Sequence, residues 1–146
     1  MRVTSAIIIK DNKILITQKG LQGRFAKKWE FPGGKIDAGE TPEECIVREL
    51  FEELQIRIEV DAFFGKCIHK YPEGENIVLA YFCTWHSGNI TLTEHSAYQW
   101  VTVEELSQYD FTPADILLAD KLQLEIKGKS IFSLNDGGKM NAVVEE

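Results

Sequence analysis

Apolar and polar residues alternate along much of the chain, and β-branched or aromatic residues gather in runs between clusters of glycine, proline and asparagine. Both patterns are typical of β-strands. We expect strands at 3–9, 13–19, 56–72, 76–86 and 97–102. Lys10, Asp11 and Asn12 separate the first two strands and favour a tight turn, so these strands are expected to form a hairpin.

Two other segments repeat their apolar residues with the period of an α-helix. The first covers 42–54, where Thr41 is a suitable N-cap and Pro42 fits the first helical position. The second covers 112–126 and begins with the same Thr-Pro pair. Its candidate core residues are Ile116, Leu117, Leu118, Leu122 and Leu124.

Several strands, one central helix and one C-terminal helix predict an α+β fold, arranged as an α/β/α layered domain. We expect a single domain over residues 1–127, a length that buries a substantial core. A C-terminal tail follows at 128–146. It contains one short β-type run, 130–134, and its remaining residues are expected to fray.

The helix at 42–54 has an unusual polar side. At about 100° per residue, the three carboxylates Glu49, Glu52 and Glu53 fall within an arc of about 100°. The apolar residues on the opposite side are expected to face the core: Ile46, Val47, Leu50, Phe51 and Leu54. A solvated acidic face is the ordinary explanation. However, like charges at this spacing repel, and the last helical turn disfavours anions, so bound divalent cations would explain the crowding better.

Composition and charge narrow the classes of partner. With 146 residues, 44% of them hydrophobic and 27% charged, the chain is typical of a soluble globular protein. The net charge of −7 and the lack of a Lys/Arg-rich run exclude a duplex nucleic acid as the expected partner. A small phosphorylated ligand stays open, because bound Mg²⁺ can invert the local field.

The cysteines suggest a reducing compartment. Cys45, Cys67 and Cys83 form no CxxC pair and no zinc-type spacing with histidine, so we expect reduced thiols and a cytoplasmic protein. The first apolar run is too short for a signal peptide, and we expect no membrane-spanning segment. The sequence leaves a monomer and a homodimer equally open.

The spacing around the carboxylate helix is far more specific than its composition. Gly34 and Glu40 precede the stretch from Arg48 to Glu53 in the form G-x5-E-x7-R-E-U-x-E-E, where U is an apolar residue. This form resembles the Nudix box. The box usually ends in x-G-U, and here Gln55 replaces the glycine. The sequences WEFPGGK and FTPADI extend the resemblance over about 3–124, toward the MutT-type branch of 8-oxo-dGTP diphosphatases and CTP pyrophosphohydrolases.

This resemblance implies an α/β/α sandwich with a mixed sheet, and hydrolysis of a nucleoside triphosphate to the monophosphate and pyrophosphate. It implies Mg²⁺ as cofactor, with Mn²⁺ as a substitute, because divalent ions neutralise the triphosphate and activate water. The implied metal ligands are the Gly34 carbonyl, Glu49, Glu52, Glu53 and Glu94. Arg48 would orient the glutamates. Glu53 is our first choice for the catalytic base, with Glu52 or Glu94 as alternatives.

The substrate-binding residues expected from the same resemblance are Lys19, Phe31, Gly33, Lys35 and Asp115. Phe31 could stack on the base or fill the core. Asp115 matches the base-reading position. An ionised aspartate accepts only, which suits the adjacent N1–H and N2–H₂ donors of a guanine-type base such as 8-oxo-dGTP. The sequence PAD also resembles the branch that prefers CTP and modified dCTP.

Two other functions remain in competition: a Nudix hydrolase of another nucleotide, and a retired Nudix fold that only binds nucleotides or proteins. We interpret His69 and His86 as polar strand or loop residues, whereas His95, next to Glu94, is a candidate to line the site. A non-glycine residue at position 55 is expected to cost about 1 kcal/mol if it adopts a left-handed conformation at the helix end.

Overall fold

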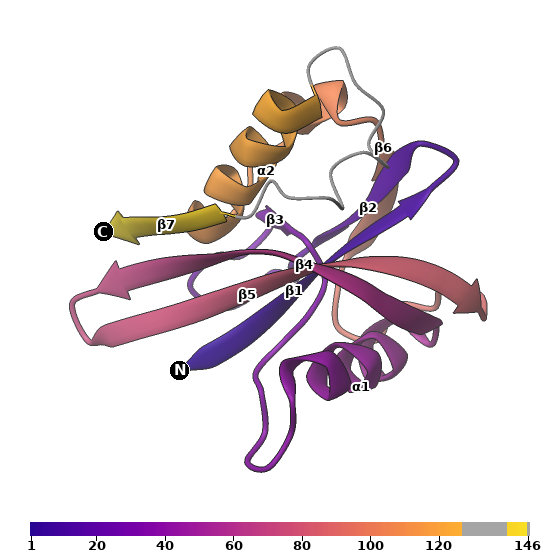
Figure 1. The fold of residues 1–146 in the computed structure, drawn as a ribbon, viewed down its shortest axis with the longest axis horizontal. Coiled ribbons are helices and arrows are strands. Elements are labelled where there is room, and N and C mark those ends of the chain that lie inside the picture. The colour runs from indigo at the N-terminus through magenta and orange to yellow at the C-terminus, as the bar shows by residue number, and fades with distance from the viewer. Residues whose placement is uncertain (127–139, 146) are drawn as a thin grey trace.

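The computed structural model describes residues 1–126 and 140–145 (Figure 1). Its strands are β1 (Arg2–Lys10), β2 (Lys13–Gln18), β3 (Trp29–Glu30), β4 (Arg57–Tyr71), β5 (Gly74–Ser87), β6 (Ala97–Val101) and β7 (Met140–Glu145). Its helices are α1 (Pro42–Leu54), the 3-10 helix η1 (Glu104–Gln108) and α2 (Pro113–Ile126). The strands expected between residues 3 and 102 and both expected helices are therefore present, within a few residues at their ends.

The strands described form one mixed sheet in the order β3-β2-β1-β5-β4-β7, with β6 also paired to β2. β1 runs parallel to β5, with Thr4 opposite Leu79. β4 runs antiparallel to β5 and parallel to β7. The expected hairpin between β1 and β2 is confirmed, and Asp11 and Asn12 both adopt positive φ in its turn.

The two α-helices cover opposite faces of the sheet (Figure 1). Alternating residues of β1 point to opposite faces, as expected for a strand. Ile7 belongs to the core that contains Leu118 of α2, whereas Ile8 belongs to the core that contains Leu50 of α1. These two cores, one on each side of the sheet, confirm the α/β/α sandwich.

Helix α2 packs differently from our expectation in two positions. Leu118 and Leu122 are fully buried, as expected, but Ile116 and Leu124 are 45% and 76% exposed. Assigning these last two residues to the core was wrong. The small residues Ala114 and Ala119 are buried instead, and their size lets the helix backbone approach the sheet closely.

The C-terminal tail contains a strand that the sequence analysis did not expect. The run at 130–134, expected as a strand, lies outside the described residues. Where we expected a frayed end, β7 pairs with β4, and Gly65 lies opposite Met140. The parallel pairing adds this segment to the edge of the sheet.

Cys45, Cys67 and Cys83 are all buried and carry free thiols, as expected. Burial raises the pKa of the Cys67 thiol to about 11, which makes it a poor nucleophile at neutral pH. Among the described residues, no helix has both the length and the apolar composition to cross a membrane.

Candidate functional site

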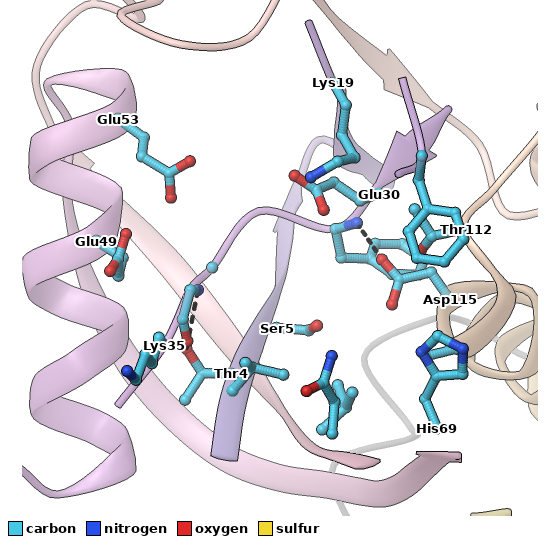
Figure 2. Close-up of a pocket in the computed structure, with 18 of the residues that line it drawn as sticks. Thr4, Ser5, Lys19, Glu30, Lys35, Glu49, Glu53, His69, Thr112 and Asp115 are labelled. Atoms are coloured by element: carbon cyan, nitrogen blue, oxygen red, sulfur yellow. Dashed lines mark hydrogen bonds between the residues drawn. The ribbon is translucent and has the colours of Figure 1, made fainter. Parts of the chain in front are cut away.

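A cleft with a volume of about 340 Å³ lies between α1 and the start of α2. Figure 2 shows Glu49 and Glu53 on one side of this cleft and Asp115 on the other, with Lys19 and Glu30 between them. The segment that carries Gly33, Gly34 and Lys35 crosses the floor next to β1. The cleft therefore joins a carboxylate end on α1 to a second polar end on α2.

Helix α1 begins as the sequence predicts. The Thr41 hydroxyl accepts a hydrogen bond from the Glu44 N–H at 3.0 Å, and the Glu44 carboxylate accepts one from the Thr41 N–H at 2.9 Å. This reciprocal capping box fixes the first turn. At the other end, Gln55 adopts the expected left-handed conformation with φ of 61°.

The orientation of α1 about its own axis differs from our expectation. Val47 and Phe51 are each 41% exposed, so their placement in the core was wrong. Glu53 is buried instead, together with Cys45, Ile46, Leu50 and Leu54. On a helix of about 100° per residue, this moves the centre of the buried face by roughly 60° toward the carboxylates. The rotation turns Glu49 and Glu53 into the cleft.

Glu53 is the most perturbed carboxylate of the site. Its Oε1 atom is buried and has no hydrogen-bond partner in the described part of the chain. Burial, followed by the nearby Glu49, Glu30 and Glu94 carboxylates, raises the pKa of Glu53 to about 9. A bound cation would reverse this cost, because it stabilises the ionised form that the surroundings disfavour.

Arg48 ties the carboxylates of the box together. Its Nε atom donates to Glu40 at 2.7 Å, and its Nη1 atom donates to Glu49 at 2.9 Å and to Glu52 at 3.2 Å. Its Nη2 atom donates to the Lys35 carbonyl at 3.0 Å. The Arg48 guanidinium lowers the pKa of Glu40 to about 2 and, in return, the carboxylates raise the pKa of Arg48.

Glu52 does not share the position of its two neighbours. Its side chain is 53% exposed and pairs with Arg48 on the outer side of α1, away from the lining of the cleft. The structure therefore brings together Glu49, Glu53 and Glu94 at the cleft and leaves Glu52 at its rim. The ideal helix places Glu52 about 100° from Glu53, which accounts for this separation.

Glu94 reaches the cleft on a loop that is fastened to the end of α1. The Thr91 N–H donates to the Leu54 carbonyl at 2.9 Å, and the Thr93 N–H donates to the Glu53 carbonyl at 3.2 Å. The Thr93 hydroxyl donates to the Glu52 carbonyl at 3.1 Å. These bonds satisfy carbonyl groups that a helix end leaves open, and they hold Glu94 beside the last turn of α1.

The double glycine allows the floor of the cleft to approach β1. A Cβ atom on Gly33 would lie 2.0 Å from the Thr4 carbonyl oxygen, so only glycine fits. The Gly34 carbonyl accepts hydrogen bonds from the Thr4 N–H at 2.8 Å and from the Thr4 hydroxyl at 3.3 Å. The carbonyl of Gly34, a predicted metal ligand, is therefore directed to β1 and engaged by Thr4 in this structure.

Asp115 lies buried at the other end of the cleft. Its Oδ2 atom accepts a hydrogen bond of 2.8 Å from the Phe31 N–H. Burial, and then the Glu30 charge, raise the pKa of Asp115 to about 8, whereas the Phe31 bond and Lys19 oppose this shift. A protonated Asp115 can donate a hydrogen bond as well as accept one. This widens the choice of bases beyond the acceptor-only expectation.

Phe31, Lys19 and Lys35 all line the cleft, but they differ in what they offer. The Phe31 ring is buried and stacks on Phe111 at a centroid distance of 5.3 Å. Its side chain therefore fills the core, which was one of the two expected roles. Lys19 and Lys35 are the cationic groups of this lining.

Sequence reasoning missed several residues of the cleft lining, among them Phe25, Glu30 and His69. His69, interpreted as an ordinary strand residue, is 4% exposed, and its ring packs against the Phe25 ring with their centroids 5.8 Å apart. Glu30 directly precedes Phe31 in the WEFPGG segment, so this segment could have indicated it. His69 has no sequence signal, because the pairing of β4 with β5 brings it to the cleft. His95 lies beside Glu53, as its neighbour Glu94 suggested.

The oxygen donors of the cleft fit a hard divalent cation. Among residues 1–126 and 140–145, no three His, Cys, Asp or Glu side chains converge closely enough to hold an ion as they stand. Arg48 holds the Glu49 carboxylate at 2.9 Å, which accounts for part of this spread. Nevertheless, Glu49, Glu53 and Glu94 line one cleft, and the buried Oε1 of Glu53 lacks a partner in the described chain. Carboxylates are the preferred ligands of such ions, so the chemistry of this lining fits the cation.

Comparisons with known proteins agree with these features. The family model described as "NUDIX domain" matches residues 1–122. The CTP pyrophosphohydrolase of Escherichia coli (strain K12) is 36% identical over 124 residues, covering 82% of this chain and 89% of that protein. The 8-oxo-dGTP diphosphatase of the same strain is 33% identical over 114 residues, covering 78% of this chain and 88% of that protein.

Solved structures show the same fold. The solution structure of the E. coli ORF135 protein has a TM-score of 0.74 and 36% identity, and the match covers 82% of this chain and 85% of that chain. A MutT NUDIX hydrolase from Burkholderia pseudomallei has a TM-score of 0.74 and 26% identity, and the match covers 82% of this chain and 95% of that chain. The shared fold places α1 and the cleft in a common framework.

Proposed function

Because this chain belongs to the Nudix family, whose domain model matches residues 1–122, we propose that it is a metal-dependent nucleoside triphosphate pyrophosphohydrolase. The reaction consumes one water and converts the triphosphate into the nucleoside monophosphate and pyrophosphate. The observation that carries this proposal is the single cleft that joins Glu49 and Glu53 on α1 to Asp115 on α2. A nucleoside triphosphate needs two such regions: one that binds the metal-bound phosphates, at α1, and one that binds the base, at α2.

Mg²⁺ is the proposed cofactor, with Mn²⁺ as a substitute. Glu49, Glu53 and Glu94 would hold it, and Glu52 would join them after a change of rotamer. Gly33 also lines the cleft, and its carbonyl would replace the engaged Gly34 carbonyl as the main-chain ligand. When bound, such ions neutralise phosphate charge and make bound water more acidic.

Glu53 is the proposed catalytic base. Its carboxylate lines the cleft beside Glu49, and a bound cation would keep it ionised, as a base must be. Arg48 would orient Glu49 through the bond described above and would release Glu52 when that side chain turns to the metal. The complete set of Arg48 and the α1 glutamates argues against a retired, non-catalytic fold.

We favour 8-oxo-dGTP as the substrate, with hydrolysis of CTP or modified dCTP as the second candidate. Asp115 accepts through its ionised form and donates through its protonated form, so it can pair with the N1–H, N2–H₂ or O6 groups of a guanine-type base. Its proximity to the Lys19 charge places a cation near the same end of the cleft. The names of the two E. coli relatives, one for each substrate, support both candidates.

The proposed setting is cleansing of the cytoplasmic nucleotide pool, in support of DNA repair. Buried free thiols at Cys45, Cys67 and Cys83 are consistent with a reducing compartment. We propose that the catalytic domain covers residues 1–127, ending just after α2, and that β7 adds a strand to its sheet.

A pyrophosphate-release assay with Mg²⁺ tests the function directly. The panel comprises 8-oxo-dGTP, dGTP, CTP, 5-methyl-dCTP and ATP. We expect release from at least one of these nucleotides, fastest with 8-oxo-dGTP, and none after Glu53→Gln. An Asp115→Ala variant should flatten the preference among the bases while binding metal as before. Failure of the folded wild-type protein to release pyrophosphate from any of them would contradict the proposal.

A further inference from the structure

We propose that His95 is a positioning residue, which holds the Glu53 carboxylate in the cleft by bridging it to Glu30. This inference rests on the proposed function, because Glu53 is the proposed base and metal ligand. It adds two residues, His95 and Glu30, that lie outside the box and approach Glu53 from other parts of the chain.

Three side chains from separate elements form the bridge. His95 Nε2 lies 2.9 Å from Glu30 Oε2, at hydrogen-bond distance, and Glu30 ends the short strand β3. On its other side, His95 Nδ1 is buried and has no hydrogen-bond partner among the described residues, and it faces Glu53 Oε2 at 3.6 Å, just beyond hydrogen-bond distance. The side chain of His95 is 4% exposed, and those of Glu30 and Glu53 are 23% and 11% exposed. The bridge is therefore largely shielded from water.

Burial makes this contact more than a surface ion pair. Exposed pairs contribute little because water screens them, whereas a buried imidazole between two carboxylates has few alternative positions. The loop that carries His95 is also fixed, because the Thr93 N–H donates to the Glu53 carbonyl and the Ser96 N–H donates to the Gln18 carbonyl at 3.0 Å. Both the ring and its supporting backbone are thus held in place.

Glu53 needs such support. Its Oε1 atom has no hydrogen-bond partner among the described residues, and its Oε2 atom faces the His95 ring on the side opposite to Glu30. Without the ring, the carboxylate could turn away from Glu49 and Glu94. Partners that orient a metal ligand commonly affect metal affinity or activity by about 10-fold to 100-fold.

The chain provides a matched control. His86 Nε2 lies 2.8 Å from Glu59 Oε2, almost the same distance as in the His95–Glu30 pair. However, the His86 and Glu59 side chains are 59% and 62% exposed, and neither residue lines the cleft. Removal of His86 deletes one exposed imidazole–carboxylate contact, whereas removal of His95 deletes a similar contact with Glu30 and also the contact with Glu53.

The first test compares His95→Ala, His95→Gln and His86→Ala in the pyrophosphate-release assay. We expect His95→Ala to lower kcat by about 10-fold or more, with KM for the nucleotide unchanged within about two-fold. His95→Gln, whose amide can donate to Glu30, should recover part of kcat. His86→Ala should behave as the wild type. An unchanged kcat in His95→Ala, or no recovery in a folded His95→Gln, would overturn the proposal.

A second readout separates positioning from mere stability. In the presence of a nucleotide analogue that resists cleavage, Mn²⁺ affinity is measured by electron paramagnetic resonance. His95→Ala should bind Mn²⁺ about 10-fold more weakly and His86→Ala should not. Glu30→Gln should weaken binding in the same direction, and adding it to His95→Ala should cause no further loss. Unchanged Mn²⁺ affinity, or fully additive losses, would contradict the bridge.

The two readouts also distinguish this inference from the proposed function. If the wild-type protein releases no pyrophosphate, the proposed activity fails, yet the Mn²⁺ titration still decides whether His95 positions Glu53. If the wild type is active and His95→Ala matches it in kcat and Mn²⁺ affinity, the activity stands and the bridge is wrong.

Discussion

The backbone of Gly34 lies directly against the carboxylate of Glu49: a Cβ atom on Gly34 would lie 2.3 Å from the Glu49 carboxyl carbon. We predict that Gly34→Ala displaces the Glu49 carboxylate and abolishes most of the pyrophosphate release. Weaker Mn²⁺ binding should accompany this loss, because Glu49 is a proposed ligand. Steady-state kinetics and Mn²⁺ titration measure both effects.

Gly39→Ala is the control for this variant. Gly39 has a φ of 80°, but a Cβ atom there would meet no other atom within 4 Å. The substitution should therefore cost about 1 kcal/mol of stability and leave Mn²⁺ affinity unchanged. Equal losses of activity in the two variants at a temperature where both are folded would contradict the specific role of Gly34.

Acid stability should depend on the Arg48–Glu40 pair. The pKa of Glu40 is lowered to about 2 in the folded protein, chiefly by its hydrogen bonds with Arg48. Because this pKa is lower than in the unfolded chain, Glu40 stabilises the fold at pH values above about 4.5. This stabilisation is lost as the pH falls from about 4.5 toward 2. Glu40→Gln should lower the melting temperature at pH 7 and reduce its decline in acid. Melting curves of the wild type and Glu40→Gln are compared from pH 7 to 2.5. A parallel decline of the two melting temperatures would contradict the role of the Arg48–Glu40 pair.

Asp115 should have the opposite effect on the pH dependence of stability. Its pKa is raised from 3.8 to about 8, so the folded state binds a proton that the unfolded state has released. Stability from this group is complete below pH 4 and falls as pH rises toward 8. Asp115→Asn keeps an oxygen for the Phe31 N–H and should flatten this decline. Urea unfolding at pH 5 and pH 8 measures it, and an unchanged difference between the two pH values would refute the assignment.

Gln55 allows two substitutions with opposite expected signs. Its left-handed conformation is strained for a non-glycine residue, but its Nε2 atom donates to the Phe51 carbonyl at 3.1 Å. Gln55→Gly relieves the strain but loses this exposed bond. The melting temperature should therefore rise, with a gain in the free energy of unfolding below about 1 kcal/mol. Gln55→Ala keeps the strain and loses the bond, so it should lower the melting temperature. A decrease in both variants would show that the bond outweighs the strain.

The sequence predicted α1 well where local chemistry decides. Thr41 and Pro42 start the helix, and Leu54 ends it before the left-handed Gln55, because caps and turns depend on neighbouring residues. The rotation of the helix about its axis was not predictable in the same way. It depends on how α1 packs on the sheet, and that packing exposes Val47 and buries Glu53.

The candidate site shows the same division. The spacing of the box gave Arg48 and its neighbouring glutamates, since they share one helix. The bridge from His95 to Glu30 joins residues 65 positions apart, and the Asp115–Phe31 bond spans 84 positions. Only the three-dimensional arrangement of the sheet brings such residues together, so spacing along the chain carried no sign of either contact.

The central claim is that the α1 carboxylates and Glu94 bind divalent ions together with a nucleotide. Isothermal titration calorimetry with Mg²⁺ and Mn²⁺, in the presence of a triphosphate analogue that resists cleavage between the α and β phosphates, tests it most directly. We predict saturable binding to the wild-type protein and its loss in the Glu49→Gln/Glu53→Gln double variant. Absence of binding to the wild type, or equal binding to the folded double variant, would contradict the account.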